Sequence, residues 1–297
     1  MSYAFRLVCV SLAAFAIVHL ATAIAVNAVA LRAIWLAERM NARAAARFLL
    51  MLRLAPVAAS LAIVGVLCVP SYLRFEPRSA DEEVGAACLM LAALAAAMCL
   101  ESGARALRAL RATRRWLGDR TPPNTVALAG LIRTRVMVAE SVAGALSAPE
   151  LDAAIRHERA HAASRDNLKR LAMLAAPRTI PFFPGRFAGI EAAWKKFSEW
   201  AADDCAASGD PGRSLALASA LIRVARLGAA QAPPLVTSLL DGDLTARVDR
   251  LLAPVAEGRP DRWTPAILLF AAIALAVLIS SPAALPWVHY LLERLIH

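Results

Sequence analysis

Apolar residues form four long runs without charged side chains, separated by a long segment of mixed character. The runs cover residues 7–31, 54–73, 84–100 and 266–288. A helix needs about 20 mostly apolar residues to cross the hydrocarbon core of a bilayer, and each run approaches that length. We therefore predict four transmembrane helices. For the shortest run, 84–100, a buried alanine-rich helix is the alternative interpretation.

The arginines beside these runs predict how the chain is oriented. Five follow the first run and five follow the third, whereas the loop after the second run holds two arginines and four acidic residues. Basic residues concentrate in cytoplasmic loops, so both termini are expected outside. This interpretation gives three regions: transmembrane helices in 1–100, a cytoplasmic domain in 101–262, and a fourth helix with a short tail in 263–297.

Composition narrows the function classes. The net charge of +10 would suit a nucleic-acid-binding protein, but most of the excess is arginine beside the apolar runs, where topology and anionic lipid explain it. Aromatic residues are sparse in the basic stretches, so we expect no direct nucleic-acid contact. The five cysteines include no C-x-x-C pair, which argues against a thiolate zinc site and a disulfide framework.

The candidate chemistry is an H-E-x-x-H motif made by His157, Glu158 and His161. Residues four apart share one face of a helix, so both imidazoles can reach one metal ion. A carboxylate at the position of Glu158 can take a proton from a metal-bound water. The alternative interpretation is a surface helix with two ordinary histidines, because a motif of three fixed residues also occurs by chance.

The rest of the cytoplasmic segment predicts mostly helices. We expect an arginine-rich amphipathic helix over 103–118 and a short β-hairpin or two strands over 126–139. Ser147 and Glu150 match a capping box that begins the motif helix, which we expect to continue to Ala176 before a proline. Further helices are predicted over 188–207, 214–227 and 243–252, with a Pro- and Phe-rich turn over 181–185.

The third metal ligand is expected to be a carboxylate. Catalytic zinc sites hold the ion with three protein ligands, and the cytoplasmic segment contains no third histidine. Glu199 and Asp203 lie one turn apart on a predicted helix. Glu199 is therefore the expected ligand, and Asp203 the expected acceptor of a hydrogen bond from a ligating imidazole. A solvated acidic helix end is the alternative interpretation.

This pattern resembles the membrane zinc metallopeptidases of the BlaR/MecR antirepressor family, and the resemblance covers nearly the whole chain. The H-E-x-x-H and E-x-x-x-D elements are also shared with the HtpX and CAAX-prenyl-protease group, but the three spans before the motif and Asp166 favour the first family. The matching residues are His157-Glu158-Arg-Ala-His161, Asp166, Pro-Phe-Phe-Pro at 181–184, Glu199-Trp-Ala-Ala-Asp203-Asp204 with Ala206 and Ala207, and Arg247-Val-Asp-Arg250-Leu-Leu.

The resemblance implies a mostly α-helical, polytopic protein of the bacterial cytoplasmic membrane. Its cytoplasmic domain would have the gluzincin-like zinc-peptidase fold, with helices and a small β-hairpin or sheet. One Zn²⁺ per chain would be held by His157, His161 and Glu199. Glu158 would act as general base and then as acid towards the leaving amine.

The resemblance also implies supporting roles for Asp203 and Asp166 behind the ligands, and a substrate added as a strand along 126–139. Two departures matter. Ser164 stands where the family usually has a basic residue, which affects a local contact and not the zinc. Few residues follow the last predicted span, where antibiotic-sensing members carry a penicillin-binding domain. Direct β-lactam sensing is therefore not implied, and a separate sensor protein becomes a candidate partner.

The leading hypothesis is a membrane-embedded zinc endopeptidase that cuts a cytosolic or juxtamembrane protein, by resemblance a transcriptional repressor. One alternative is an HtpX-like quality-control protease for membrane proteins. Another is a non-catalytic signalling scaffold, against which the intact Glu158 argues. A transporter would need ionisable residues within its spans, where only His19 occurs. The expected partners are a protein substrate, the lipid bilayer and a sensor protein.

Overall fold

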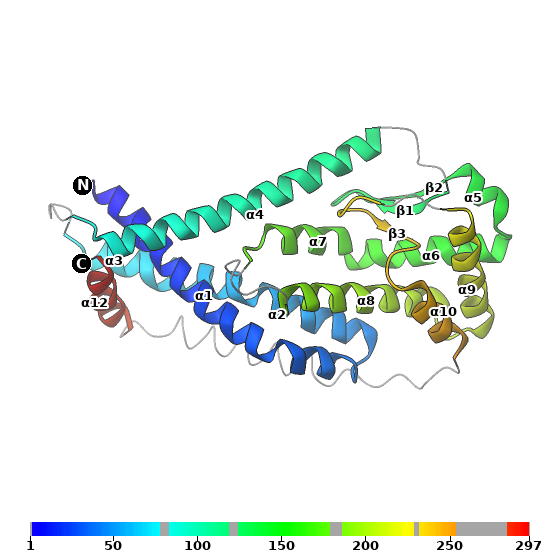
Figure 1. Cartoon of the computed structure of the whole chain (residues 1–297), viewed down its shortest axis with the longest axis horizontal. Helices are drawn as coiled ribbons and strands as arrows, with labels where there is room; N and C mark the ends of the chain where they lie inside the picture. Colours follow the sequence, from blue (N-terminus) through cyan, green and yellow to red (C-terminus); the bar gives the residue numbers. More distant parts are fainter. Residues whose placement is uncertain are drawn as a thin grey trace.

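The computed structural model describes residues 2–77, 83–118, 124–178, 186–228, 232–253 and 284–296. These residues are mostly helical and include one small β-sheet, so the predicted mostly α-helical class is confirmed. Figure 1 shows an elongated molecule, in which long helical segments extend from one end towards shorter helices and the sheet at the other.

Three long helical segments contain the first three apolar runs, and all three are apolar enough to cross a membrane. The predicted helix over 103–118 is the direct continuation of the third. The segments are α1 (Tyr3–Ala37), the continuous series α2 (Ala42–Ile63), π-helical η1 (Val64–Cys68) and α3 (Val69–Phe75), and α4 (Ala86–Gly118).

These segments are longer than a bilayer requires. The 35 residues of α1 span about 52 Å, against about 30 Å for the hydrocarbon core. The end of α1 and the beginning of α2 pack against α8 (Arg186–Ala207) in one apolar cluster. Its buried members include Ala30, Ala37, Ala45, Leu49, Phe187, Ile190, Trp194 and Phe197. The α1–α2 hairpin is thus packed into the end of the molecule that carries the motif.

Two predicted elements, the fourth apolar run and the Pro- and Phe-rich turn, lie wholly or mostly outside the described residues. Residues 254–283 and 179–185 lie outside the described residues. The end of the fourth run falls in α12 (Ala284–Ile296), whose Leu292 is buried against Cys68 and Tyr72. The fourth transmembrane helix stays a prediction.

The predicted hairpin is confirmed, and a third strand joins it. β1 (Val126–Ala129) pairs antiparallel with β2 (Arg135–Val138). The other edge of β1 pairs with β3 (Thr237–Ser238), which gives the strand order β2-β1-β3. Two paired residues are too few to produce an alternating pattern, so the sequence did not predict β3.

The motif helix is shorter than predicted. α6 (Ala148–Ser164) begins with the expected capping box of Ser147 and Glu150. It ends because Arg165 adopts the left-handed conformation (φ 56°, ψ 42°), after which α7 (Asp166–Ala175) starts. The prediction of one helix to Ala176 was therefore wrong. The remaining helices are α5 (Glu140–Ala145), α9 (Pro211–Arg226) and α10 (Leu244–Leu252).

Two packing layers fix α6 beside α8. On one side, α6 shares an apolar cluster with α9, α10 and the sheet, centred on Leu217, Leu221 and Leu239. On the other, α8 packs on α1 and α2. Arg53 of α2 and Arg105 of α4 donate to carbonyls at the end of α7, where the helix dipole favours cations. The motif face of α6 is therefore enclosed by α7, α8 and the sheet (Figure 1).

Candidate metal centre

The motif side chains lie on the buried face of α6. His157, Glu158 and His161 are each 0% exposed, whereas Arg156 and Arg159 on the same turns are exposed. This division follows the helical period, because residues one and four apart can share one face while the intervening positions point away. Burying two imidazoles and a carboxylate together is costly unless they are paired or bind an ion.

The three predicted ligands converge on one point. His157 Nε2 and His161 Nε2 are 3.1 Å apart, and each lies 3.5 Å from Glu199 Oε2. A tetrahedral zinc ion with bonds of about 2.0–2.1 Å separates its ligand atoms by about 3.3 Å. The buried group of His157, His161 and Glu199 can therefore bind a metal ion, and two imidazoles with one carboxylate are a donor set suited to zinc.

Each histidine is oriented by a carboxylate on its other ring nitrogen. His157 Nδ1 lies 2.9 Å from Asp203 Oδ1, and His161 Nδ1 lies 2.7 Å from Asp166 Oδ2. A proton on each Nδ1 leaves Nε2 free to face the metal position. The Ser198 hydroxyl donates to Asp166 Oδ2 at 2.9 Å. Asp203 and Asp166 thus lie against the two histidines, and their role in supporting a bound metal stays a prediction.

The electrostatics of this group favour a cation. Burial opposes charge on both histidines, but hydrogen bonds to Asp203 and Glu199 raise the pKa of His157. The charge of Glu199 and the hydrogen bond to Asp166 raise the pKa of His161 to about 10 against the effect of burial. His161 in turn lowers the pKa of Glu199 well below its usual value, although burial acts in the opposite direction. A metal ion would replace the protons that this arrangement attracts.

Glu158 stands apart from the ligands. Among the described residues its Oε1 is buried and has no hydrogen-bond partner, and its Oε2 accepts one long hydrogen bond, 3.4 Å, from the Thr237 hydroxyl of β3. Burial, reinforced by the charges of Glu199 and Asp241 and opposed by the histidines, raises its pKa to about 7. A carboxyl group with this pKa can both accept and release a proton near neutral pH.

Arg247 of α10 closes the site from behind and is the main residue that the sequence analysis left without a role. Its guanidinium donates to both oxygens of Asp203, at 2.9 and 2.6 Å, and to the carbonyls of Leu239 and Asp241. It also lies 3.4 Å from Glu199 Oε2. Arg247 belongs to a stretch that matches the family pattern. Its contact with Asp203 could not be predicted, because residues 44 positions apart share no periodic pattern in the sequence.

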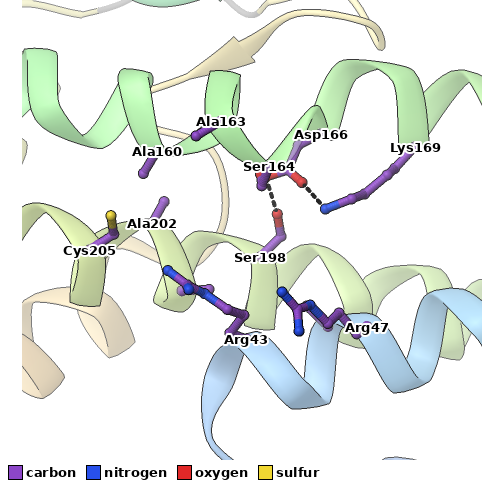
Figure 2. Close-up of a pocket in the computed structure, with 12 residues that line it drawn as sticks. Arg43, Arg47, Ala160, Ala163, Ser164, Asp166, Lys169, Ser198, Ala202 and Cys205 are labelled. Carbon is purple, nitrogen blue, oxygen red and sulfur yellow. Dashed lines mark hydrogen bonds and ion pairs between the residues drawn. The ribbon is translucent and has the colours of Figure 1, made fainter. Parts of the chain in front are cut away.

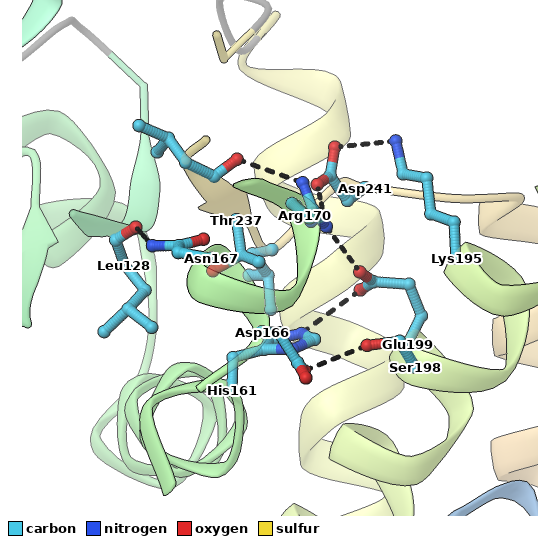
Figure 3. A network of polar contacts seen from close by, with 12 residues as sticks. Leu128, His161, Asp166, Asn167, Arg170, Lys195, Ser198, Glu199, Thr237 and Asp241 are labelled. Atoms are coloured by element: carbon cyan, nitrogen blue, oxygen red, sulfur yellow. Dashed lines mark hydrogen bonds and ion pairs between the residues drawn. The ribbon is translucent and has the colours of Figure 1, made fainter. Parts of the chain in front are cut away.

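A second polar network joins the sheet to the ligands (Figure 3). Arg170 of α7 pairs with Asp241 at 2.9 Å and lies 3.5 Å from Glu199 Oε1. Asn167 donates its amide to the carbonyls of Leu128 and Gly130, at 3.0 and 2.9 Å, and so fixes α7 against β1. These residues were also missed, because nothing in their spacing sets them apart from ordinary surface positions.

The turn after β3 comes so close to the third ligand that it needs a glycine. Gly242 has φ +89°, and a Cβ there would lie 3.2 Å from Glu199 Cγ. Beside this turn, a cavity of about 330 Å³ opens between α7, α8 and the segment before β3. Its apolar lining includes Met173, Trp194 and Pro233. The cavity gives room for a side chain next to the ligand network.

Another carboxylate–histidine group among the described residues differs from this centre. Glu76, His289 and Glu293 bring ligand atoms close together near the opposite end of the molecule. Arg6 lies 3.3 Å from Glu76 Oε1, and the Glu293 side chain is 52% exposed. A neighbouring arginine and an open carboxylate make this group a poor match to an enclosed metal centre.

Comparison with known proteins finds no match to a family model, a curated protein or a solved structure. The class of protein must therefore be described from its fold and its candidate site. Its described residues are mostly helical, and they include three helices able to cross a membrane and one enclosed group of side chains able to bind a metal ion.

Proposed function

We propose that this protein is a membrane-embedded, zinc-dependent endopeptidase. One observation carries the proposal: one atom from each of two histidines and a glutamate lies 3.1–3.5 Å from the other two, and each histidine is held by its own carboxylate. Glu158 lies beside them with an oxygen that has no partner among the described residues. This arrangement combines a place for a Lewis acid with a proton acceptor of suitable pKa, which are the two requirements of metal-assisted peptide hydrolysis.

In this proposal the residues divide the work. Zinc, when bound, supplies a Lewis acid that polarises the scissile carbonyl and lowers the pKa of water. His157, His161 and Glu199 hold it, and Asp203 and Asp166 keep the imidazoles in the tautomer that presents Nε2. Glu158 takes a proton from the attacking water at its free carboxylate oxygen and delivers it to the leaving amine.

An extended substrate would lie along the sheet. In the described structure β2 and β3 occupy the two edges of β1, but β3 pairs through only two residues. A substrate strand that displaces β3 would run directly past Glu158, which Thr237 now contacts. The cavity of about 330 Å³ beside Arg170 and Asp241 would then receive a side chain of the substrate.

We further propose that the substrate is a cytosolic or juxtamembrane protein and that cleavage serves regulation, as in repressor cleavage. The resemblance of the motifs to the antirepressor peptidases supports this. So does the packing of α8, which carries Glu199, against α1 and α2. Quality control of membrane proteins uses the same chemistry, so the identity of the substrate distinguishes the two functions.

The experiment compares full-length protein with Glu158→Gln, which keeps the size of the side chain and removes the base. Glu140→Gln, on the exposed start of α5, is the matched control. Each form is expressed in its host, metal content is measured by mass spectrometry, and proteins retained by the variant are identified. We expect Glu158→Gln to keep its zinc and accumulate uncleaved substrate, while Glu140→Gln cleaves normally.

Two outcomes would contradict the proposal. Cleavage by zinc-loaded Glu158→Gln would remove the general-base role. Full zinc stoichiometry in a Glu199→Ala variant would remove Glu199 from the metal site. If the proteins that the variant retains are bound but never cleaved by the wild-type protein, the chain is a non-catalytic scaffold. A retained set of misfolded membrane proteins would favour quality control, and a single repressor would favour regulation.

A further inference from the structure

A cavity of about 370 Å³ lies on the side of the molecule where α2 meets α6, α7 and α8. Basic side chains reach it from two elements, Arg43 and Arg47 from α2 and Lys169 from α7 (Figure 2). Much of the remaining wall consists of alanines, which leave the space open. We call this cavity the basic pocket. It is separate from the cavity beside Glu199, which has a different set of lining residues.

The two arginines of the basic pocket are available to a ligand. Arg43 and Arg47 are exposed, and within the described part of the chain neither forms a hydrogen bond or ion pair. They lie one turn apart, and Figure 2 shows both extending from α2 towards α8. Arg53 on the same helix is different, because it is buried and bonded to Glu191 and to α7 carbonyls. Exposed arginines without bonding partners among the described residues are thus a feature of the basic pocket and not of every arginine on α2.

The single acidic residue of the lining does not neutralise this pair. Asp166 already accepts from Lys169 at 2.8 Å, from Ser198 at 2.9 Å and from the His161 ring at 2.7 Å. Counting Arg43, Arg47 and Lys169 against Asp166 leaves an excess of two positive charges. The N-terminus of α2 adds positive potential, whereas that of α7 is offset by the C-terminus of α6, which ends at Ser164 in the same lining.

We propose that the basic pocket binds an anionic ligand of the phosphate class. Two guanidinium groups one turn apart can each form paired hydrogen bonds to phosphate oxygens, which is the recognition that arginine performs better than lysine. The volume accommodates a phosphate with a small substituent. The inference concerns the α2 face and does not depend on the proposed peptidase function.

The position of the pocket allows two sources of this ligand. Arg47 and Arg43 precede Arg53, next to the second apolar run, by six and ten residues, or about 9 and 15 Å along the helix. The headgroup layer is about 5–8 Å deep on each side of a bilayer. The pocket therefore lies at the outer border of the headgroups or just beyond it. A lipid phosphate can reach it from one side, and a free phosphate compound from the other.

The test uses full-length protein in neutral detergent and inorganic phosphate as the probe. Chloride at equal ionic strength is the reference. A ligand that binds only the folded state raises the unfolding midpoint in a saturable manner. We expect saturable stabilisation of the wild-type protein and a dissociation constant at least about tenfold weaker in Arg43→Gln/Arg47→Gln, given the strength of charged hydrogen bonds. Arg43→Lys/Arg47→Lys should bind with intermediate strength.

The control is Arg111→Gln/Arg115→Gln, which removes two exposed arginines with the same spacing from α4. It should bind phosphate like the wild type. For the lipid source, protein in phosphatidylcholine vesicles with or without phosphatidylglycerol is analysed by native mass spectrometry. A retained phosphatidylglycerol that Arg43→Gln/Arg47→Gln loses assigns the ligand to the membrane. The proposal is overturned if neither phosphate nor phosphatidylglycerol binds saturably, or if Arg43→Gln/Arg47→Gln still binds like the wild type. It is also overturned if the control Arg111→Gln/Arg115→Gln loses as much binding as Arg43→Gln/Arg47→Gln.

Discussion

Replacing Asp203 with alanine tests whether the contacts behind the ligands hold the metal centre together. Asp203 and Arg247 are each 1% exposed, and their two hydrogen bonds measure 2.6 and 2.9 Å. Removing one partner of a buried ion pair leaves an uncompensated charge, which costs about 3–5 kcal/mol. We expect the free energy of unfolding of the metal-free protein to fall by about this amount.

The same substitution should weaken metal binding by a separate route. His157 loses the acceptor of its Nδ1 hydrogen bond, and loss of such a partner typically lowers metal affinity about 10–100-fold. Arg247, already 3.4 Å from Glu199 Oε2, would also turn towards that oxygen and compete with the metal for it. Zinc affinity, measured by competition with a chromophoric chelator, should therefore fall by about 100-fold, the upper end of this range.

The chain contains a matched control for this experiment. Asp204 pairs with Arg250 at 2.7 Å across the same two helices, but these side chains are 50% and 32% exposed. Exposed pairs contribute about 0–1 kcal/mol, so Asp204→Ala should change little. Unfolding by denaturant in neutral detergent, followed by the fluorescence of the buried Trp194, measures both variants.

A double variant separates the two effects of Asp203. In Asp203→Ala/Arg247→Met the Arg247 charge is removed together with its partner, so stability should recover in part, because the carbonyls of Leu239 and Asp241 lose their donor. Zinc affinity should stay low because His157 still lacks its acceptor. Equal stability losses in Asp203→Ala and Asp204→Ala would refute the reasoning about burial. Unchanged zinc affinity in Asp203→Ala would refute the role of Asp203 in orienting His157.

Three further predictions concern single sites. Gly242→Ala should lower stability by about 1–3 kcal/mol and weaken zinc binding, because its Cβ would press on Glu199. The control is Gly209→Ala, which has φ +74° and open space around the new Cβ, and which should lower stability without changing zinc affinity. The unfolding and chelator assays described above measure both variants. In metal-free protein the raised pKa of Glu158, about 7, means that the folded state holds a proton that the unfolded state releases, which lowers stability by about 2.5 kcal/mol as pH rises from about 5 to 8. The raised pKa values of His157 and His161 lower stability over part of the same range in every form. The fall should therefore be about 2.5 kcal/mol smaller in Glu158→Gln than in the wild type. Glu150→Gln should cost about 1–3 kcal/mol at neutral pH. Its difference from wild type should shrink in acid, because hydrogen bonds that outweigh burial lower the pKa of Glu150, and that contribution is lost as pH falls through the lowered value.

Local patterns predicted the elements with good accuracy where the signal was itself local. The apolar runs, the hairpin over 126–139 and the capping box at Ser147 each depend on residues within one element. The break at Arg165 could not be predicted, because the left-handed conformation there carries no glycine or proline signal. It matters for the site, because the change of direction brings Asp166 to His161 Nδ1.

The candidate site divides in the same way. His157, Glu158 and His161 share one helical face, and Glu199 follows from the number of ligands that zinc requires. Arg247, Arg170 and the strand β3 come from segments far apart in sequence. Their roles exist only after folding has brought α10 and the turn at Gly242 over α8. A sequence contains no period for such contacts. The candidate ligands and the two carboxylates behind the histidines could therefore be predicted, whereas the roles of Arg247, Arg170 and β3 could not.

α8 connects the long apolar helices α1 and α2 to the candidate metal site through its two faces. Ile190, Trp194 and Phe197 recur at helical spacing and pack into the cluster formed with α1 and α2. Glu199 and Asp203 follow at the same spacing on the opposite face, since two positions turn a helix by about 200°. A rigid helix cannot shift one face without moving the other. The α1–α2 hairpin therefore helps to position Glu199 relative to the two histidines of α6, together with the direct packing of α8 on α6.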